Sequence, residues 1–157
     1  MTETDGTDIL SRLEALEQIR VLKARYCRYV DTKDWSGFAS LFSDKAMLCF
    51  PENNPDWVPI ADFLPGVDTA LHGGITVHHV HSPEISFQSD VNATGIWAMQ
   101  DRLFFPPDVA GLAKASRIAG AGHYHETYRR IDGQWLFDRV RLTRLHLAIE
   151  LQPRTVI

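Results

Sequence analysis

Residues 76–85 read TVHHVHSPEI, and this stretch places three of the chain's 7 histidines within four positions. Its β-branched residues are typical of a β-strand. Gly73 and Gly74 precede it and Pro83 lies near its end, so residues that favour turns bound the run on both sides. We therefore predict a strand here.

The three histidines of this strand divide between its two faces. Successive side chains of a strand point to opposite sides, so His78 shares a face with Thr76 and Val80. His79 and His81 share the other face. Either face can carry imidazole toward the interior of the fold, and a single histidine is as often structural as functional. Three histidines together favour a chemical role.

The composition indicates one folded domain. A chain of 157 residues buries about two-thirds of its unfolded surface, so we predict a single domain over residues 1–157 with a loose tail at 1–6. The two cysteines, Cys27 and Cys49, form no metal-binding or disulfide spacing and suit a reducing compartment. The net charge of -4 gives no basic surface for nucleic acid. No secretory signal or run of ~20 apolar residues is present, which favours a cytoplasmic protein without membrane contact.

The first third of the chain has the periodicity of helices. Apolar residues recur every three or four positions from Ile9 to Val30, which predicts a long amphipathic helix capped by Thr7 or Asp8. Asp34 is suited to cap a second, shorter helix that ends near residues 43–44. Asp31 lies between the two, where capping or turn formation is its simplest role.

Residues 51–65 contain four prolines and predict an irregular segment after a short strand at 47–50. Trp57 and Phe63 are too apolar to face water, so we expect this segment to cover a pocket. One or two helical turns follow, ending near Leu71 before the two glycines.

The remainder of the chain reads as antiparallel strands. Asp132-Gly133 is typical of a hairpin turn, with long strands on both sides. Asp101 interrupts an otherwise apolar face and must be paired, protonated or functional, because an unpaired buried charge is very costly. The last strand, from 134 to about 149, is predicted to place Arg141 on the face of Trp135 and Phe137. Helices followed by a strand meander indicate an α+β fold. The predicted apolar pocket lining comprises Trp57, Phe63, Trp97, Met99 and Leu103.

Four stretches resemble the SnoaL-like family, whose cystatin-like cone fold is also that of nuclear transport factor 2. They read IRVLKARYCRYVDTKDWSGFASLF, TVHHVHSPEI, ATGIWAMQDRL and GHYHETYRRIDGQWLFDRVRLTRL. The resemblance implies N-terminal helices packed on a strongly curved antiparallel sheet that encloses a pocket. Its motifs are most similar to those of scytalone dehydratase and bile acid 7α-dehydratase, and they indicate the fold more strongly than the substrate.

The resemblance also implies roles for individual residues. The dehydratase and dehydrochlorinase members place a catalytic acid at Asp31 and its partner imidazole at His78. The bile acid dehydratase pattern adds a tyrosine at Tyr26, an acid at Asp101 and a basic residue at Arg141.

Two further positions are less settled. His81 stands where small or hydroxyl residues are common in relatives, so the histidine that enters the pocket is left open. The scytalone dehydratase pattern has a second histidine on the penultimate strand, and His123 or His125 matches it.

These residues imply a cofactor-independent lyase. An imidazole oriented by a carboxylate removes a proton next to a carbonyl and returns it to a departing hydroxide, and Tyr26 donates to the enolate oxygen. The expected substrate is a steroid-like or polyketide-like ring compound, and dehydration is not separable here from isomerisation, cyclisation or dehydrohalogenation. The expected assembly is a homo-oligomer, a trimer or a dimer, because Val140 and Leu142 on an outer sheet face need cover.

Two other readings compete with the lyase. His79-x-His81, followed by Glu84, and His123-x-His125 resemble the metal ligands of cupin barrels. The proline within the first motif and the N-terminal helices argue against this reading, so no metal or other cofactor is expected. A second alternative is a non-catalytic domain that binds a hydrophobic ligand or another subunit.

Overall fold

The structure is a computed structural model that describes residues 4–51, 54–109 and 112–153. Three α-helices and six strands make up the described chain, together with one short 3-10 helix. The helices are α1 (Thr4–Thr32), α2 (Trp35–Ala39) and α3 (Ile60–Leu71), and η1 spans Leu112–Lys114. The strands are β1 (Phe42–Phe50), β2 (Asn54–Pro59), β3 (Ile75–Phe87), β4 (Asn92–Phe104), β5 (Ala115–Ile131) and β6 (Gln134–Leu151).

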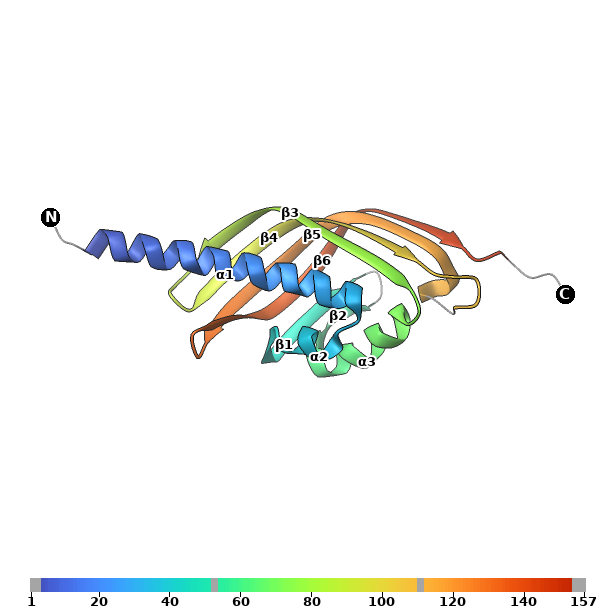
Figure 1. The fold of residues 1–157 in the computed structure, drawn as a ribbon, viewed down its shortest axis with the longest axis horizontal. Helices are drawn as coiled ribbons and strands as arrows, with labels where there is room; N and C mark the ends of the chain where they lie inside the picture. The colour runs from blue at the N-terminus through green and yellow to red at the C-terminus, as the bar shows by residue number, and fades with distance from the viewer. Residues whose placement is uncertain (1–3, 52–53, 110–111, 154–157) are drawn as a thin grey trace.

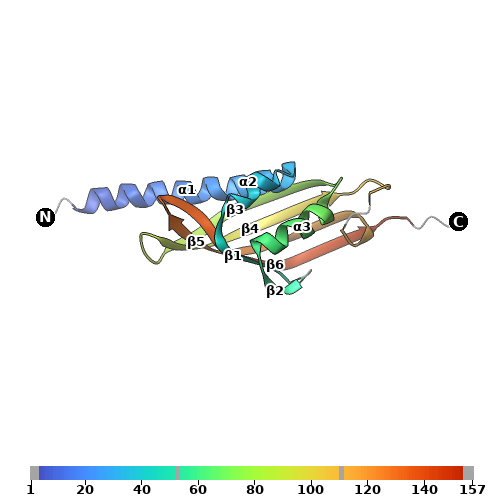
Figure 2. The ribbon, with the colours of Figure 1, turned by 90° about the horizontal axis from the view of Figure 1, so that it is seen from below.

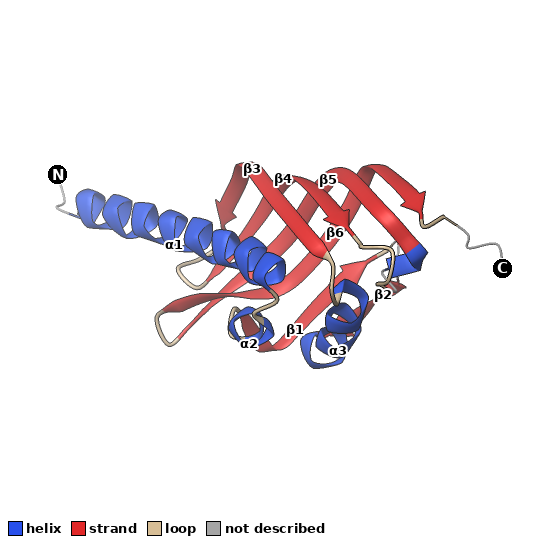
Figure 3. Cartoon of the chain, turned by 45° about the vertical axis from the view of Figure 1, so that its right-hand side comes forward, coloured by secondary structure: helices blue, strands red, loops and turns tan. Residues whose placement is uncertain are grey.

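The six strands form one sheet in the order β2-β1-β6-β5-β4-β3. Neighbours are antiparallel except β1 and β6, which run parallel. The predicted α+β class is correct, but the sheet is mixed rather than wholly antiparallel, because β1 is reached through α1 and α2 and not through a hairpin from β6. The sheet is arched without the strong curl that we predicted, and the helices lie on one of its faces (Figures 1 and 3).

Helix α1 packs on the sheet through one apolar stripe. Ala15, Ile19, Leu22 and Tyr26 recur at spacings of three and four and are all buried. The helix begins at Thr4, earlier than the predicted start near Ile9. Its first turns extend beyond the sheet in Figure 2. The apolar positions before Ala15 are consequently exposed, although the same periodicity continues through them.

The connection from α1 into the sheet follows the predicted capping. The Asp34 side chain accepts a hydrogen bond of 2.8 Å from the Gly37 backbone N–H at the start of α2. The helix ends at Ala39 rather than near residues 43–44, since β1 begins at Phe42 and pairs with β6.

The segment predicted to be irregular is mostly regular. Residues 54–59 form β2, and α3 follows with Pro65 inside it. Proline removes one hydrogen bond from a helix interior. Tertiary contacts offset this cost. Ile60 and Leu71 are buried at the two ends of α3, and the Phe63 ring stacks on Phe50 with 5.2 Å between the ring centroids. The prolines alone therefore gave a wrong prediction for this segment.

A register shift between β5 and β6 decides which residues of β6 face inward. Thr127 pairs with Arg139 and Tyr128 pairs with Phe137, which leaves Asp138 as an extra residue. One extra residue reverses the alternation of side chains. Val140 and Leu142 are consequently buried inside, and the next inward position is residue 144.

Two predictions about β6 are therefore wrong. Arg141 is exposed on the outer face and does not share a face with Trp135 and Phe137. Val140 and Leu142 do not require cover on the outer face, so the reason given for a homo-oligomer does not hold, and the oligomer itself stays a prediction.

Other strand predictions are correct. The turn between β5 and β6 is at Asp132 and Gly133, which both have positive φ, 49° and 81°. Trp97, Met99, Asp101 and Leu103 share the buried face of β4.

Within the described ranges, no helix is both long and apolar enough to cross a membrane.

The core contains a buried polar network. The Lys23 Nζ lies 2.5 Å from Glu126 Oε1, and neither side chain is exposed to solvent. The Tyr128 hydroxyl donates to Glu126 Oε2 at 2.5 Å and accepts from Trp97 Nε1 at 2.8 Å. Lys23 also lies 3.4 Å from the centroid of the Tyr124 ring. This network joins α1 to β4 and β5 inside the core.

Candidate acid–base site in the sheet cavity

A cavity of about 680 Å³ lies between the helices and the sheet. Its walls are mostly apolar and come from all three α-helices and all six strands. Polar side chains also line it, and most of them can transfer a proton or donate a hydrogen bond. These are Tyr26, His78, Asp101, Tyr124 and Arg144, together with Asp56 and Asp62.

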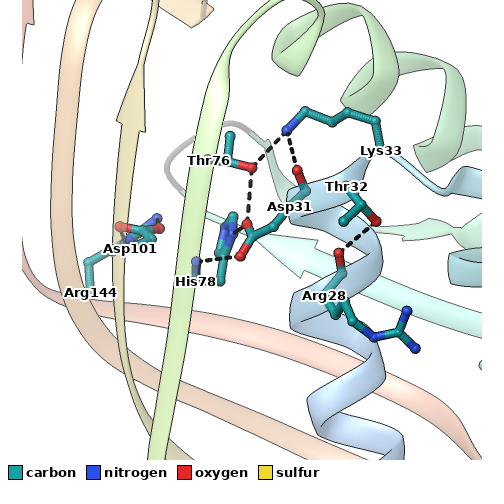
Figure 4. A network of polar contacts seen from close by, with 8 residues as sticks. All are labelled: Arg28, Asp31, Thr32, Lys33, Thr76, His78, Asp101 and Arg144. Carbon is teal, nitrogen blue, oxygen red and sulfur yellow. Dashed lines mark hydrogen bonds and ion pairs between the residues drawn. The ribbon is translucent and has the colours of Figure 1, made fainter.

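Asp31 and His78 form a direct pair. Asp31 lies in the last turn of α1, and His78 lies on the inward face of β3 between Thr76 and Val80. The Asp31 Oδ1 is 2.7 Å from His78 Nδ1, and Asp31 Oδ2 accepts the His78 backbone N–H at 2.9 Å (Figure 4). The carboxylate therefore holds both the ring and the backbone of His78.

The position of Asp31 depends on how α1 ends. The backbone N–H of Asp34 donates to Tyr29 O at 2.9 Å and that of Lys33 donates to Val30 O at 3.2 Å, which closes the helix. Asp31 is thus in the final turn, where its side chain reaches β3. Tyr26, five residues earlier, faces the sheet and lines the cavity.

The Asp31 contact selects one tautomer of His78. An ionised carboxylate accepts hydrogen bonds but cannot donate them, so Nδ1 of the neutral imidazole carries the hydrogen. The lone pair then lies on Nε2, the nitrogen that Asp31 does not contact. Because His78 lines the cavity, it is placed to take a proton from a bound molecule.

Tyr26 and Tyr124 are neutral donors next to His78. Burial raises the pKa of Tyr26 well above its usual value, and the charge of Glu126 raises it further. A hydrogen bond between the hydroxyls of Tyr26 and Tyr124 lowers the pKa of Tyr26, but less than burial raises it. Burial likewise raises the pKa of Tyr124. Both phenols therefore keep their hydrogens at neutral pH and can donate to an oxygen in the cavity.

Asp101 is paired with Arg144 and not with Arg141. The Arg144 Nη1 donates to Asp101 Oδ1 at 2.8 Å and Nη2 to Oδ2 at 2.6 Å. The pair crosses β5 directly above Gly120, where a Cβ atom would lie 2.5 Å from Asp101 Oδ1 and closer still to Arg144 Nη1. Glycine at 120 therefore makes room for this ion pair on the cavity wall.

The four histidines of the two H-x-H motifs lie on the outer face of the sheet. His79 and His81 are exposed, and their ring centroids are 6.3 Å apart. His125 is also exposed and its Nε2 lies 3.0 Å from Thr143 Oγ1. The supporting roles predicted for His81 and His125 in the pocket are therefore wrong, and His78 is the cavity-facing histidine of β3.

A cupin-like metal centre does not fit this arrangement, because both H-x-H pairs face away from the cavity. Among the described residues, no group of three or more His, Cys, Asp or Glu side chains is arranged to hold a metal ion.

Of the five residues predicted to line the pocket, Phe63 and Leu103 line the cavity and the other three do not. Trp57 is 38 % exposed and packs against Arg139 outside the cavity. Trp97 and Met99 are buried in the core on the same face of β4 as Leu103, but they do not line the cavity.

Tyr124 and Arg144 were not predicted from the sequence. Alternation of buried positions along residues 124, 126 and 128 could have indicated Tyr124. No local signal indicates Arg144, because its inward direction depends on the bulge at Asp138.

Comparisons with known proteins place these features in a family. The SnoaL-like domain family matches residues 11–141. A protein named as a probable cyclase from Gibberella zeae is 26% identical over 145 residues, which cover 85% of this chain and 93% of the relative.

The fold also matches solved structures of low sequence identity. A hexachlorocyclohexane dehydrochlorinase from Novosphingobium barchaimii has a TM-score of 0.74 at 20% identity, with 94% of this chain and 98% of that chain covered. The Kfla4162 protein from Kribbella flavida also has a TM-score of 0.74, at 19% identity, with 84% and 91% covered. At these identities the likeness concerns the fold alone.

Proposed function

This chain belongs to the SnoaL-like family, and we propose that it is a cofactor-independent enzyme that moves a proton next to a carbonyl group, as in a dehydratase-type elimination or a related isomerisation or cyclisation. The observation that carries this proposal is the contact of 2.7 Å between Asp31 and His78 at the wall of an apolar cavity. A domain that only binds a ligand has no need of a carboxylate that orients a cavity-facing imidazole.

The proposed elimination begins at His78. Its Nε2 takes the proton from the carbon next to the substrate carbonyl, and the electron pair of that C–H bond moves into the carbonyl to form an enolate. The resulting imidazolium is stabilised by Asp31, which keeps its negative charge. Acid–base catalysis of this kind contributes a rate factor of about 10² to 10⁴.

The Tyr26 hydroxyl donates a hydrogen bond to the enolate oxygen. Its hydroxyl is neutral and buried, and in such a low-dielectric position a hydrogen bond to a developing negative charge is stronger than in water. Tyr124 orients the Tyr26 hydroxyl through their hydrogen bond. Collapse of the enolate expels hydroxide from the neighbouring carbon, and the His78 imidazolium protonates it. The products are water and a conjugated double bond, and His78 is neutral again.

The cavity walls support an apolar ring compound as the substrate. A volume of about 680 Å³ accommodates a molecule of several fused rings, and Phe38, Leu48, Phe63 and Leu103 provide apolar surface for it. The bidentate Asp101–Arg144 pair leaves 18% of the Arg144 side chain exposed. We propose that this exposed part binds a polar substituent of the ring system.

The relatives carry names of different reactions, a cyclase and a dehydrochlorinase. Both reactions can be run by a base beside an activated C–H bond, so the same side chains serve either outcome. The leaving group and the carbon skeleton of the substrate then decide which product forms.

The test is turnover of a panel of β-hydroxy ketones on fused rings, followed by the ultraviolet absorbance of the conjugated product. We expect His78→Ala to abolish turnover and retain binding. The matched control is His79→Ala, because its side chain leaves the same strand on the outer face. Equal activity of wild type and His78→Ala would refute the proposed mechanism. Saturable binding without turnover of any panel member would favour the ligand-binding alternative.

A further inference from the structure

Lys33 occupies a backbone position that favours glycine. It is the residue after α1, and its φ of 59° lies in the left-handed region that side chains with a Cβ rarely adopt. The same backbone turn closes α1 through the hydrogen bond from Asp34 N to Tyr29 O. Glycine would satisfy this turn with less strain, so the turn does not explain the lysine.

The Lys33 side chain turns back toward the Asp31–His78 pair. Its Nζ donates to Thr76 Oγ1 at 2.8 Å and to the Asp31 backbone carbonyl at 3.3 Å (Figure 4). Partial burial lowers the pKa of Lys33, while the charge of Asp31 acts to raise it. The ammonium is thus held by the Thr76 hydroxyl and the Asp31 backbone carbonyl.

Thr76 connects the two charges. A threonine hydroxyl has a single hydrogen, and because its oxygen accepts from Lys33 that hydrogen is directed to Asp31 Oδ1, 3.0 Å away. Accepting from a cation also makes the hydroxyl a stronger donor. Asp31 therefore receives hydrogen bonds from Thr76 and from the backbone N–H of His78 while it contacts Nδ1.

We propose that Lys33 is a positioning residue that sets the pH range in which His78 acts as a base. Through Thr76 it fixes Asp31 in its ionised, oriented form, and its own charge disfavours a second cation on the imidazole. The proposal rests on the proposed function for its catalytic meaning, but the contacts that carry it do not depend on a substrate.

Other titratable groups also line the cavity that His78 faces. Asp101 is opposite His78 on β4 and is paired with Arg144 of β6, so these two charges largely cancel. Burial keeps the phenols of Tyr26 and Tyr124 neutral. Asp56 of β2 and Asp62 of α3 line the same cavity and are exposed. Their charges are screened by water and oppose the effect of Lys33.

The size of the effect follows from the chain of contacts. Steps of 2.8, 3.0 and 2.7 Å link Lys33 Nζ to His78 Nδ1 through Thr76 and Asp31. In a partly solvated site, loss of this cation should raise the midpoint of the His78 titration by about 0.5 to 1 pH unit.

The test is a titration of the histidine imidazole resonances by NMR in the full chain without substrate, with His78 assigned by a His78→Gln variant. Lys33→Gly should raise the His78 midpoint by the amount given above without lowering the melting temperature, because glycine suits the left-handed turn. Lys33→Met should raise the midpoint equally but melt below Lys33→Gly. Lys33→Arg keeps the charge and should keep the wild-type midpoint.

The matched control is Lys45→Met, which removes an exposed lysine of β1 and should leave the His78 midpoint unchanged. An unchanged or lowered midpoint in folded Lys33→Gly and Lys33→Met would overturn the proposal, as would an equal rise in Lys33→Arg. A purely structural lysine would alter the melting temperature alone. Failure of the wild type to turn over any ring ketone would refute the proposed function and leave this titration readable.

Discussion

Replacing Gly120 with alanine should break the ion pair between Asp101 and Arg144. The added Cβ would lie 2.5 Å from Asp101 Oδ1 and closer to Arg144 Nη1, and contacts below about 3.0 Å do not occur for real Cβ atoms. The two side chains must therefore shift out of their bidentate geometry, and Asp101, only 3% exposed, would lose hydrogen bonding while it stays buried.

Removal of one partner from a buried ion pair costs about 3–5 kcal/mol. Arg144 would be displaced rather than lost, and its side chain is 18% exposed, so we expect a somewhat smaller loss, about 2–4 kcal/mol. For a chain of this length, that corresponds to a fall of about 6–12 °C in melting temperature.

Thermal denaturation followed by circular dichroism measures the loss. Gly66→Ala is the matched control, because an added Cβ there meets no atom within 4 Å, and its melting temperature should not fall. Gly120→Ala combined with Arg144→Ala should cost little more than Arg144→Ala alone, since both changes remove the same contact. A Gly120→Ala protein that melts with the wild type, or additive losses in the double variant, would refute the reasoning.

Three other outcomes are expected. Lys23→Met should lower the free energy of unfolding by about 3–5 kcal/mol in chemical denaturation, because Glu126 would stay buried without its partner, and adding Glu126→Gln should restore part of the loss. Stability should fall as the pH rises from 9 toward 11, because burial raises the pKa of Cys27 from 9.0 to about 11 and the unfolded thiol releases its proton first. In denaturant titrations, the stability of the Cys27→Ala variant should fall less over the same pH range. Sedimentation should show a homo-oligomer, to which exposed Ile75 (64%) and Leu145 (78%) can contribute apolar contact, and a monomer at micromolar concentration would contradict this.

Local patterns were sufficient to predict the elements that local chemistry controls. Alternation along 76–80 assigns His78, Thr76 and Val80 to one face, and that face is the inward one. The cap at Asp34 and the turn at Asp132 and Gly133 depend on residues next to each other in the sequence, so they too could be predicted.

Features that depend on pairing between distant strands could not be predicted in this way. The bulge at Asp138 exists because β6 must match both Arg139 to Thr127 and Phe137 to Tyr128, and it turns Arg144 inward and Arg141 outward. Helix α3 likewise forms around Pro65 because its two ends are buried, which propensity does not include.

The position of the Asp31–His78 pair lies between these two cases. The resemblance to the SnoaL-like family indicates the two residues, but their contact requires α1 to end at the level of β3. The role of Lys33 was not visible in the sequence, because only its positive φ and the direction of its side chain distinguish it from other surface lysines.

The most direct test of the proposed dyad is a double-mutant cycle of Asp31→Asn and His78→Ala, measured as turnover of a ring ketone that the wild type converts. Asp31→Asn should lower turnover by a factor of about 10² or more while ligand affinity and fold are retained, because the imidazolium loses its counter-charge. His78→Ala should be at least as damaging, and the double variant should cost much less than the product of the two single effects, because the residues act as one unit. Independent, multiplicative losses, or full activity in His78→Ala, would contradict the assignment of this pair as the acid–base centre.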